Sequence, residues 1–469
     1  MSGLSQAVQS RSQVCVQGLG FVGSAMAVAI ASARDRAGEV LYQVTGVDLP
    51  TAAGKERIAH LARGEFPFLT ADTELAEAAR VAHEAGNLTA TSDPAAYESA
   101  ATIIIDIPLD VSGSAADPQV DFGPLRDAIR TVAGKAAPGT LILLETTVPP
   151  GTCAHVVAPI LAEEAAKRGL AEDSFLLAHS YERVMPGRDY LSSIVHFWRV
   201  YAGHTEAAAD ECERFLSSVI HVEDFPLTRL GSTTASETAK VMENSYRAAN
   251  IALVDEWARF AEAVEIDLFE VVDAIRVRPT HSNIRQPGFG VGGYCLTKDP
   301  LFARVGAREL FNRPDLLFPF SELTVQTNRE MPLATISAVR RGLGGELNGK
   351  RVALLGIAYR EDVADTRFSP AQTFVEVLRA EGAEVSCHDP MVDHWFELDE
   401  AVGPAFPDPA DVEALVIGVA HSVYREVDWL SWLKQRRPTI IDANRVIEND
   451  QVSALRRAGI EVIIVGSGR

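Results

Sequence analysis

The sequence lacks any long apolar run and any apolar leader. Its longest apolar stretches, such as TIIIDIPL and TLILLETTV, have the length of a β-strand, whereas a helix that crosses a bilayer needs about 18 or more apolar residues. The first residues, MSGLSQAVQSRSQ, are polar, unlike the apolar core of a secretory signal. We therefore expect a protein without a membrane-spanning helix.

Cysteine and positive charge are also scarce. The five cysteines are an odd number and form no C-x-x-C pair, so neither a disulfide framework nor a metal site is predicted. The formal net charge is −21, and nucleic acid or an anionic lipid surface would repel such a chain. These absences predict a reducing, cytoplasmic location with no metal, no nucleic-acid partner and no membrane partner.

What the sequence does contain is an α/β pattern at each end and a helical pattern between them. Short apolar strands alternate with helical segments in the first part, and five more short strands run from KRVALLGIAY to EVIIVGSG. Residues 232–264 have no proline or glycine and carry apolar residues at helical spacing, which predicts one long helix. The pattern predicts an α/β fold of two Rossmann-like, doubly wound parallel-sheet domains joined by a helical region. The predicted boundaries are 1–230, 231–330 and 331–469.

The first strand leads into a glycine loop typical of dinucleotide binding. Gly18, Gly20 and Gly23 fit G-x-G-x-x-G between a strand and an alanine-rich helix, although a tight strand-to-helix turn alone would also use them. In such loops the glycines make the turn, admit the pyrophosphate and let the helix pack closely. Asp48 ends the second strand and could accept from the ribose hydroxyls. Because VTGVDLPTAAGK contains no arginine for a 2′-phosphate, the pattern favours NAD over NADP.

The segment GFGVGGYCLTKDP places Cys295 after four glycines. Glycines let a ligand approach the backbone closely, so this cysteine is a candidate nucleophile. A thiolate could attack an aldehyde to give a thiohemiacetal, from which hydride loss leaves a thioester. Asp299 could orient a water or a base. The alternatives are a tight loop with an incidental cysteine, an exposed capping aspartate and a solvated Lys298.

A second candidate cluster lies on the predicted long helix. Lys240 and Asn244 are four residues apart and therefore share one face, so an ammonium and an amide could address the same oxygen. A lysine beside a carbinol would stabilise the alkoxide that hydride loss requires. By pattern alone, a solvent-exposed lysine is the commoner outcome.

Together these motifs resemble the UDP-glucose/GDP-mannose dehydrogenase family of nucleotide-sugar 6-dehydrogenases. The resemblance rests on GLGFVG, TTVPPGT, YERVMPGR, ETAKVMENSYRAANIALVDE, GFGVGGYCLTKDP and GIAYREDVADTRFSP, in family order along almost the whole chain. It implies an NAD domain, a helical dimerisation region that carries the cysteine loop, and a C-terminal domain that binds the UDP of a sugar donor. It also implies a homodimer or larger homo-oligomer, and two successive NAD-dependent oxidations at C6 of a UDP-sugar through an aldehyde and a Cys295 thioester.

The resemblance also implies roles for individual residues. The implied catalytic residues are Cys295, Lys240, Asn244, Asp299, Glu182 and Thr147. The implied NAD-binding residues are Gly18, Gly20, Phe21, Val22, Gly23, Asp48, Pro108, Thr147 and Arg367. The implied substrate-binding residues are Glu182, Arg183, Lys240, Asn244, Arg278, Gly292 and Arg360. Arg276 competes with Arg278 for the position that reaches the partner subunit's substrate.

Three residues depart from the usual family pattern: Tyr181 before the motif glutamate, Tyr294 before the cysteine, and Thr297 two residues after it. They flank the sugar pocket, so UDP-GlcNAc, UDP-ManNAc and UDP-glucose all stay open. The arginine and MPGR after the motif glutamate resemble the UDP-N-acetylhexosamine branch. The rival hypotheses are a two-electron β-hydroxyacid-type dehydrogenase, which needs neither the cysteine nor a second sheet, and a non-catalytic nucleotide-sugar or NAD-binding protein, which would be expected to have lost its catalytic residues.

Overall fold

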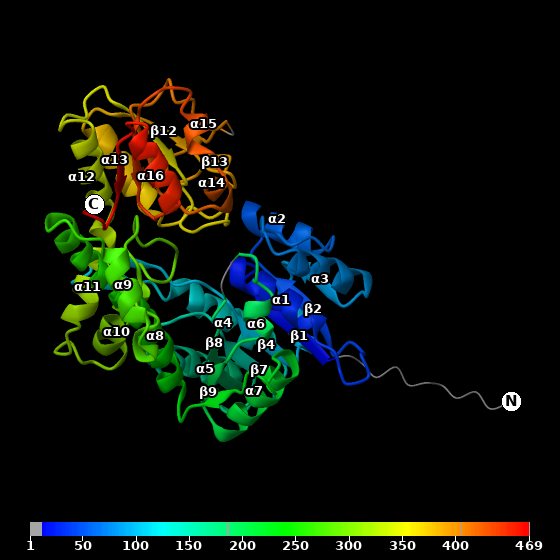
Figure 1. Ribbon diagram of the computed structural model, residues 1–469. Helices are drawn as coiled ribbons and strands as arrows, with labels where there is room; N and C mark the ends of the chain where they lie inside the picture. Colours follow the sequence, from blue (N-terminus) through cyan, green and yellow to red (C-terminus); the bar gives the residue numbers. More distant parts are fainter. Residues whose placement is uncertain (1–11, 185–186, 404, 469) are drawn as a thin grey trace. The chain divides into compact units, whose positions relative to one another are not determined.

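The computed structural model describes residues 12–184, 187–403 and 405–468, and the chain divides into two compact units (Figure 1). Unit 1 consists of Met1–Gly113, Pro118–Val241 and Phe302–Leu317, and unit 2 consists of Ser114–Asp117, Met242–Leu301 and Phe318–Arg469. Each unit is built around one sheet. The domain boundaries at 230 and 330 stay a prediction.

An eight-stranded sheet forms the centre of unit 1. Its order is β10-β9-β8-β7-β4-β1-β2-β3, and β8 and β9 are its antiparallel pair. The strands are β1 (Ser12–Gln17), β2 (Tyr42–Val47), β3 (Leu88–Thr91), β4 (Thr102–Ile105), β7 (Leu141–Leu144), β8 (Leu176–Tyr181), β9 (Val200–Gly203) and β10 (Thr228–Arg229). The runs TIII of β4 and LILL of β7 are buried throughout, as expected of parallel strands that are covered on both faces.

Helices pack on both faces of this sheet. Side chains of β1 and β4 alternate between two apolar clusters: Val14 and Ile104 belong to one, and Cys15 and Ile105 belong to the other. The first cluster includes residues of α1 (Phe21–Ser32), α2 (Ala52–Leu61), α3 (Thr73–Glu84), α6 (Ser192–Val195) and α7 (Glu206–Val219). The second includes residues of α4 (Gly123–Lys135), α5 (Ala158–Lys167) and α10 (Phe302–Val305). This doubly wound arrangement confirms the predicted Rossmann-like fold.

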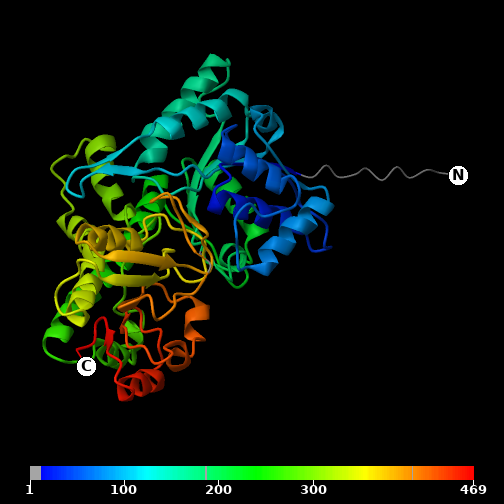
Figure 2. The same cartoon turned by 90° about the horizontal axis from the view of Figure 1, so that it is seen from above.

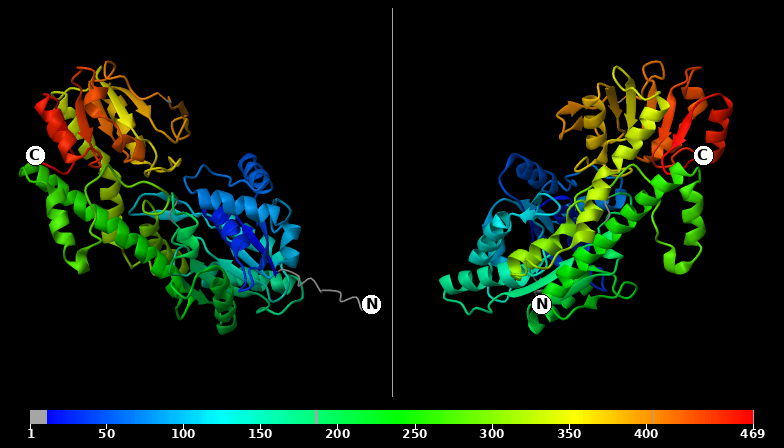
Figure 3. Two further views of the ribbon diagram at one scale, coloured as in Figure 1. Left: turned by 45° about the vertical axis from the view of Figure 1, so that its right-hand side comes forward. Right: turned by 90° about the vertical axis from the view of Figure 1, so that its left-hand side faces the viewer.

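Helix α8 runs without a break over Thr233–Ala263 (Figure 3), which confirms the single long helix predicted for residues 232–264. Its residues up to Val241 belong to unit 1 and the rest to unit 2. Unit 2 then adds α9 (Leu268–Arg276), α11 (Pro319–Glu330) and α12 (Pro332–Gly342). In the parts of the chain that the structure describes, no helix is both long and apolar enough to cross a membrane.

A second, all-parallel sheet forms the core of unit 2. Its order is β12-β11-β15-β16-β17, and its yellow and orange strands lie side by side in Figure 2. The strands are β11 (Arg351–Leu355), β12 (Glu384–His388), β15 (Ala414–Ile417), β16 (Thr439–Asp442) and β17 (Val462–Ile464), and the helices that follow α12 are α13 (Pro370–Ala380), α14 (Ser422–Arg425), α15 (Trp429–Trp432) and α16 (Asn449–Arg457). The apolar side chains again fall into two clusters, one with α12 and α13 and the other with α15 and α16. The predicted second doubly wound sheet is therefore confirmed.

Two small antiparallel pairs complete the described strands. They are β5 (Val111–Gly113) with β6 (Pro118–Val120), and β13 (His394–Trp395) with β14 (Glu400–Ala401).

Candidate active site and cofactor site

The glycine loop between β1 and α1 has the backbone geometry that a pyrophosphate needs. Gly18 has a φ of +96°, and a Cβ there would lie 2.4 Å from the carbonyl oxygen of Asp106. A Cβ on Gly23 would lie 1.9 Å from the carbonyl oxygen of Gly18, so both positions require glycine. Gly20 precedes α1 and has open space where a Cβ would be. Phosphate oxygens can therefore approach the backbone N–H groups at the start of α1.

Asp48 lies at the end of β2 beside this loop. Its carboxylate accepts from the backbone N–H groups of Leu19 at 3.3 Å and Leu49 at 2.7 Å, and it pairs with Arg57 at 3.2 Å. Arg57 is two residues beyond VTGVDLPTAAGK, so the prediction that Asp48 has no arginine nearby is wrong. The acid and the guanidinium neutralise each other, so the sequence argument for NAD over NADP loses its force, and the choice of cofactor rests on other observations.

The other residues predicted to bind NAD in unit 1 gather at one edge of its sheet. Phe21 and Val22 are half-buried in the first turn of α1, Pro108 is exposed after β4, and Thr147 is half-buried after β7. Since β1, β4 and β7 are parallel, the loops that follow them lie at the same, carboxyl-terminal edge. Arg367 belongs to unit 2.

Lys240 and Glu182 form a polar cluster in unit 1. Lys240 is only 5% exposed, so the alternative of a solvent-exposed lysine is wrong. Its Nζ donates to the carbonyl oxygen of Glu182 at 2.7 Å and lies 3.5 Å from the carboxylate of that residue. The buried ring of Tyr181 lies 5.3 Å from this ammonium and 5.2 Å from the guanidinium of Arg183. Tyr181 is thus an aromatic surface for two cations.

Glu237, one turn before Lys240 on α8, was not among the predicted residues. Its buried carboxylate accepts from the backbone N–H groups of Gly151 at 2.6 Å and Cys153 at 2.7 Å. Burial raises the pKa of Glu237 to about 7, although these hydrogen bonds oppose the rise. Glu237 therefore ties α8 to the turn after TTVPP, which carries Thr147. The sequence signal that could have identified Glu237 is an acidic residue at a position of the long helix that faces the core.

Asp299 is the centre of a second cluster, which lies in unit 2. It is completely buried, and its carboxylate accepts from Nδ2 of Asn244 at 2.7 Å and from Nζ of Lys298 at 2.9 Å. Its backbone N–H donates to the carbonyl oxygen of Cys295 at 2.9 Å. Lys298 is 5% exposed and lies 4.1 Å from the centre of the Tyr294 ring. The alternatives of an exposed capping aspartate and a solvated lysine are therefore both wrong.

The glycines before the half-buried cysteine make room for the chain itself. A Cβ on Gly290 would lie 2.5 Å from the side chain of Pro370, and one on Gly292 would lie 2.7 Å from Cβ of Tyr359. Gly293, with a φ of +80°, faces the Tyr359 ring, which a Cβ would approach to 2.8 Å. Segment 359–370 thus fills the space in which a side chain at these three positions would lie, which is one reason for glycine there; approach of a ligand to their backbone stays a prediction. A substrate contact by Gly292 stays a prediction.

The predicted substrate arginines of unit 2 differ in how they are held. Arg276 donates from NH2 to the carbonyl oxygen of Ile284 at 2.7 Å, so its own chain holds its guanidinium. Arg278 and Arg360 are exposed. Which of Arg276 and Arg278 reaches the partner subunit's substrate stays a prediction.

Arg367 and the two unusual residues around the cysteine lie near one another in unit 2. Arg367 makes a two-point ion pair with Asp365, with NH2 to Oδ2 at 2.7 Å, and its guanidinium lies 5.6 Å from the centre of the Tyr294 ring. Thr297 donates from its hydroxyl to the carbonyl oxygen of Gly293 at 2.9 Å. Tyr294 therefore contacts one cation from the cysteine loop and one from the segment between β11 and α13.

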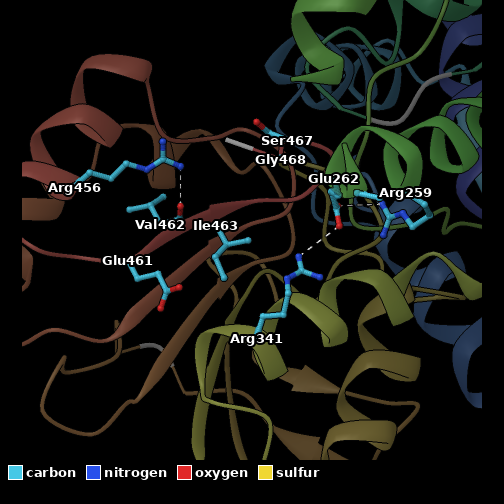
Figure 4. A pocket seen from close by; sticks show the side chains of 10 residues that line it. Arg259, Glu262, Arg341, Arg456, Glu461, Val462, Ile463, Ser467 and Gly468 are labelled. Carbon is cyan, nitrogen blue, oxygen red and sulfur yellow. Dashed lines mark hydrogen bonds and ion pairs between the residues drawn. The ribbon is translucent and has the colours of Figure 1, made fainter. Parts of the chain in front are cut away.

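A separate cavity of about 580 Å³ in unit 2 contains none of the predicted residues (Figure 4). Arg259, Arg341 and Arg456 line it together with Glu262. The carboxylate of Glu262 lies 3.6 Å from Arg259 and 3.4 Å from Arg341, as the dashed lines in Figure 4 show. The lining of this cavity therefore holds three guanidinium groups and two carboxylates, those of Glu262 and Glu461.

Comparison with known proteins identifies the family to which the chain is similar. Three models of the UDP-glucose/GDP-mannose dehydrogenase family match the chain: the NAD binding domain over residues 12–219, the central domain over 234–329 and the UDP binding domain over 353–449. A UDP-N-acetyl-D-mannosamine dehydrogenase of Pyrococcus horikoshii is 31% identical over 95% of this chain and 98% of its own length. The enzyme of the same name from Methanocaldococcus jannaschii is 29% identical over 97% of each chain.

Solved structures agree with these matches. A UDP-D-ManNAc dehydrogenase from Pyrococcus horikoshii has a TM-score of 0.80 at 29% identity and covers 97% of this chain and 99% of its own. An NDP-N-acetyl-D-galactosaminuronic acid dehydrogenase from Methanosarcina mazei has a TM-score of 0.77 at 29% identity and covers 98% and 96%. The matches confirm the resemblance, the fold class and the NAD cofactor. The glycine loop at the open start of α1 is the part of unit 1 that fits the cofactor's pyrophosphate.

Proposed function

Because the chain belongs to the UDP-glucose/GDP-mannose dehydrogenase family, we propose that it oxidises the C6 hydroxyl of a UDP-N-acetylhexosamine to the uronic acid. UDP-N-acetyl-D-mannosamine is the first candidate because two relatives carry that substrate in their names; UDP-GlcNAc and UDP-glucose follow. The observation that carries the proposal is the completely buried Asp299, hydrogen-bonded to Asn244 and directly downstream of Cys295. NAD supplies the chemistry of accepting a hydride at each of the two oxidations.

In the first oxidation, Lys240 and Asn244 hold the C6 oxygen. They are four residues apart on the continuous helix α8, so both side chains leave the helix on the same face. The hydrogen bond from Asn244 to Asp299 fixes the orientation of the amide. The hydroxyl proton passes to a water, the buried ammonium of Lys240 stabilises the alkoxide that forms, and hydride loss then gives the aldehyde.

In the second oxidation, Cys295 becomes the nucleophile. Its thiol gives its proton to a water that Asp299 orients, and the sulfur adds to the aldehyde carbon to form a thiohemiacetal. Loss of a second hydride converts this adduct to a thioester. Water then cleaves the carbon–sulfur bond, which releases the carboxylate and restores the thiol. Glu182, held by Lys240, and Thr147 position that water.

We also propose that the protein is a homodimer that forms through α8. Large apolar side chains recur on one side of this helix within unit 2 at spacings close to a heptad, and their exposed fractions are 71% for Met242, 54% for Tyr246, 52% for Leu253, 51% for Trp257 and 50% for Phe260. An exposed stripe of this kind is typical of a helix that packs against another helix. Arg278, exposed and not held like Arg276, is the better candidate to reach the partner's substrate.

A cytoplasmic location is part of the proposal, because the catalytic thiol has to stay reduced. No disulfide occurs among residues 12–184, 187–403 and 405–468. A uronic acid donor made there would serve the synthesis of surface polysaccharide or of glycosylated metabolites.

The test is the amount of NADH formed per sugar. The protein and Cys295→Ala are incubated with UDP-ManNAc, UDP-GlcNAc, UDP-glucose, UDP-galactose and GDP-mannose, and NADH is read at completion. We expect about two NADH per sugar for one UDP-N-acetylhexosamine and loss of the second oxidation in the variant. One NADH per sugar, or turnover that the substitution leaves unchanged, would contradict the thioester route and favour a two-electron dehydrogenase. No NADH with any donor would favour a binding role.

A further inference from the structure

Two acidic side chains meet in the interior of unit 1, directly after neighbouring strands. Asp106 follows β4 and Glu145 follows β7, and the parallel register pairs the last residues of these strands, Ile105 and Leu144. Asp106 is 8% exposed and Glu145 is 1% exposed. The two carboxyl groups lie within hydrogen-bonding reach of each other. The proposed oxidation gives neither residue a role.

One buried arginine completes this cluster. Arg199, which is 2% exposed and directly precedes β9, donates from NH1 to a carboxyl oxygen of Glu145. Oδ2 of Asp106 and Oε2 of Glu145 have no hydrogen-bond donor among the described residues. Two ionised carboxylates beside one guanidinium would leave a buried net charge of −1, which is strongly unfavourable in a dry interior. One proton shared by the two carboxyl groups removes that charge and supplies the missing donor.

The electrostatic surroundings place this proton on Asp106. Burial, followed by the negative charge of Glu145, raises the pKa of Asp106 well above its usual range; Glu182 adds to the rise and Arg199 opposes it. Burial also raises the pKa of Glu145, but the charge and hydrogen bond of Arg199 oppose that rise more directly. From α7, the buried thiol of Cys212 faces the same cluster, and burial raises its pKa, so it stays neutral.

The cluster lies where the nicotinamide half of the cofactor belongs. β1 lies between β2 and β4, so the strand order reverses at the glycine loop, and a dinucleotide binds across such a point with one nucleotide on each side. Asp48, after β2, marks the adenosine side. The nicotinamide side is therefore the edge where β4 and β7 end, with Asp106 and Glu145 beneath it. Asp106 also packs directly against Gly18 and Gly23.

We propose that Asp106 and Glu145 hold one proton between them and, together with Arg199, form an electrically neutral floor beneath the nicotinamide. In this role the three are positioning residues for the redox half of the cofactor. A negative floor would hold the positively charged ring of NAD more tightly than the neutral ring of NADH, and a positive floor would do the reverse. A neutral floor lets both forms bind and leave. This inference rests on NAD binding and not on the proposed sugar, so a failed substrate test would leave it standing.

The first test is infrared difference spectroscopy of the protein at neutral pH. Asp106→Asn keeps the shape of the protonated acid and can donate to Glu145, so we expect it to fold and to lose one carbonyl stretching band of a protonated carboxylic acid. Asp110→Asn, at an exposed aspartate four residues further along the same loop, is the matched control and should lose none. A spectrum unchanged in this band region by Asp106→Asn would overturn the proposal.

Glu145→Gln provides a second variant for the same spectrum. With Glu145 neutral, Asp106 becomes the carboxylate partner of Arg199 and gives up its proton, so the same band should disappear although Asp106 is intact. A merely structural role for Glu145 would leave the band in place, and persistence of the band would contradict the shared proton.

The second test is the ratio of the dissociation constants of NAD and NADH, measured by direct titration at pH 7. If Asp106 is already neutral, Asp106→Asn should leave this ratio unchanged within experimental error. The double variant Asp106→Asn/Glu145→Gln leaves Arg199 as an unpaired positive charge, and the ratio should shift at least about threefold toward NADH. A comparable shift in the single variant would show that Asp106 is ionised in the wild type and would overturn the proposal.

Discussion

In both sheets of this protein, a glycine of positive φ follows one strand and an aspartate follows the neighbouring strand, but the two turns have different roles. In unit 1, Gly18 follows β1 with a φ of +96°, and Asp48 follows the neighbouring strand β2. In unit 2, Gly356 follows β11 with a φ of +89°, and Asp389 follows the neighbouring strand β12. Both sheets therefore turn through a left-handed glycine with an aspartate beside the turn.

The difference lies in what the aspartate binds. Asp48 accepts from one N–H of the glycine loop, that of Leu19 at 3.3 Å, and its side chain is 11% exposed. Asp389 is completely buried and accepts from the N–H groups of Ile357 at 2.8 Å and Ala358 at 3.0 Å and from His421 at 3.2 Å. The second loop thus uses its N–H groups within the protein, whereas the first keeps the start of its helix open for phosphate. The same turn can either bind a dinucleotide or close a fold.

The largest effect is expected from closing the first loop. Gly23→Ala places a Cβ 1.9 Å from the carbonyl oxygen of Gly18, so α1 has to move away from β1. We expect the affinities for NADH and NAD to fall by about 100-fold or more. The fluorescence of bound NADH measures the first, and displacement of NADH by NAD measures the second. Gly134→Ala, at an exposed helical position with open space around it, is the control and should keep wild-type affinity. Retention of NAD binding within about threefold in Gly23→Ala would contradict the assignment.

The matching change in the second loop should act on stability and leave NAD binding intact. Asp389→Asn removes a buried carboxylate that His421 and three backbone N–H groups contact, and we expect a loss of about 2–3 kcal/mol in the stability of unit 2. Amide hydrogen exchange of β11 and β12 measures it. Unchanged hydrogen exchange together with weakened NAD binding would contradict a structural role for Asp389 within unit 2.

The effect of Asp389→Asn should also depend on pH. Burial would raise the pKa of Asp389, but the hydrogen bond and charge of His421 and the N–H groups of Ala358 and Met391 lower it overall. A lowered folded-state pKa gives a stabilisation that is present above the unfolded value of about 3.9 and is lost as the pH falls through the folded value. The difference in stability between wild type and variant should therefore be full at pH 7 and shrink below about pH 4. A difference that stays constant down to pH 3 would contradict the ionised, hydrogen-bonded state.

A smaller effect is expected at the open aspartate. Asp48→Ala removes the acceptor for the ribose hydroxyls and releases Arg57, so NAD should bind about tenfold more weakly while NADP improves relative to NAD. The double variant Asp48→Ala/Arg57→Ala should lose the relative gain for NADP. Titration with each cofactor measures the two affinities. Equal losses of affinity for NAD and NADP in the single variant would contradict a role for Arg57 in binding NADP.

Local patterns made much of the fold predictable. Apolar runs of strand length, the glycine spacing after β1 and the unbroken helical pattern of α8 are properties of short segments, so the sequence alone revealed both sheets and the long helix. The features it missed depend on packing. Lys298 is buried through contacts with Tyr294 and Asp299 of its own loop, and the other features depend on packing between distant segments. The glycines before Cys295 face segment 359–370, and Asp106 meets Glu145 only through the pairing of β4 with β7. No local rule marks such neighbours.

The most direct measurement is calorimetric titration of the protein with NAD and with UDP, each alone and each in the presence of the other. The division of roles between the two sheets predicts one NAD and one UDP per chain, neither displacing the other, with Gly23→Ala losing NAD and keeping UDP. Two NAD molecules per chain, or displacement of UDP by NAD, would contradict it.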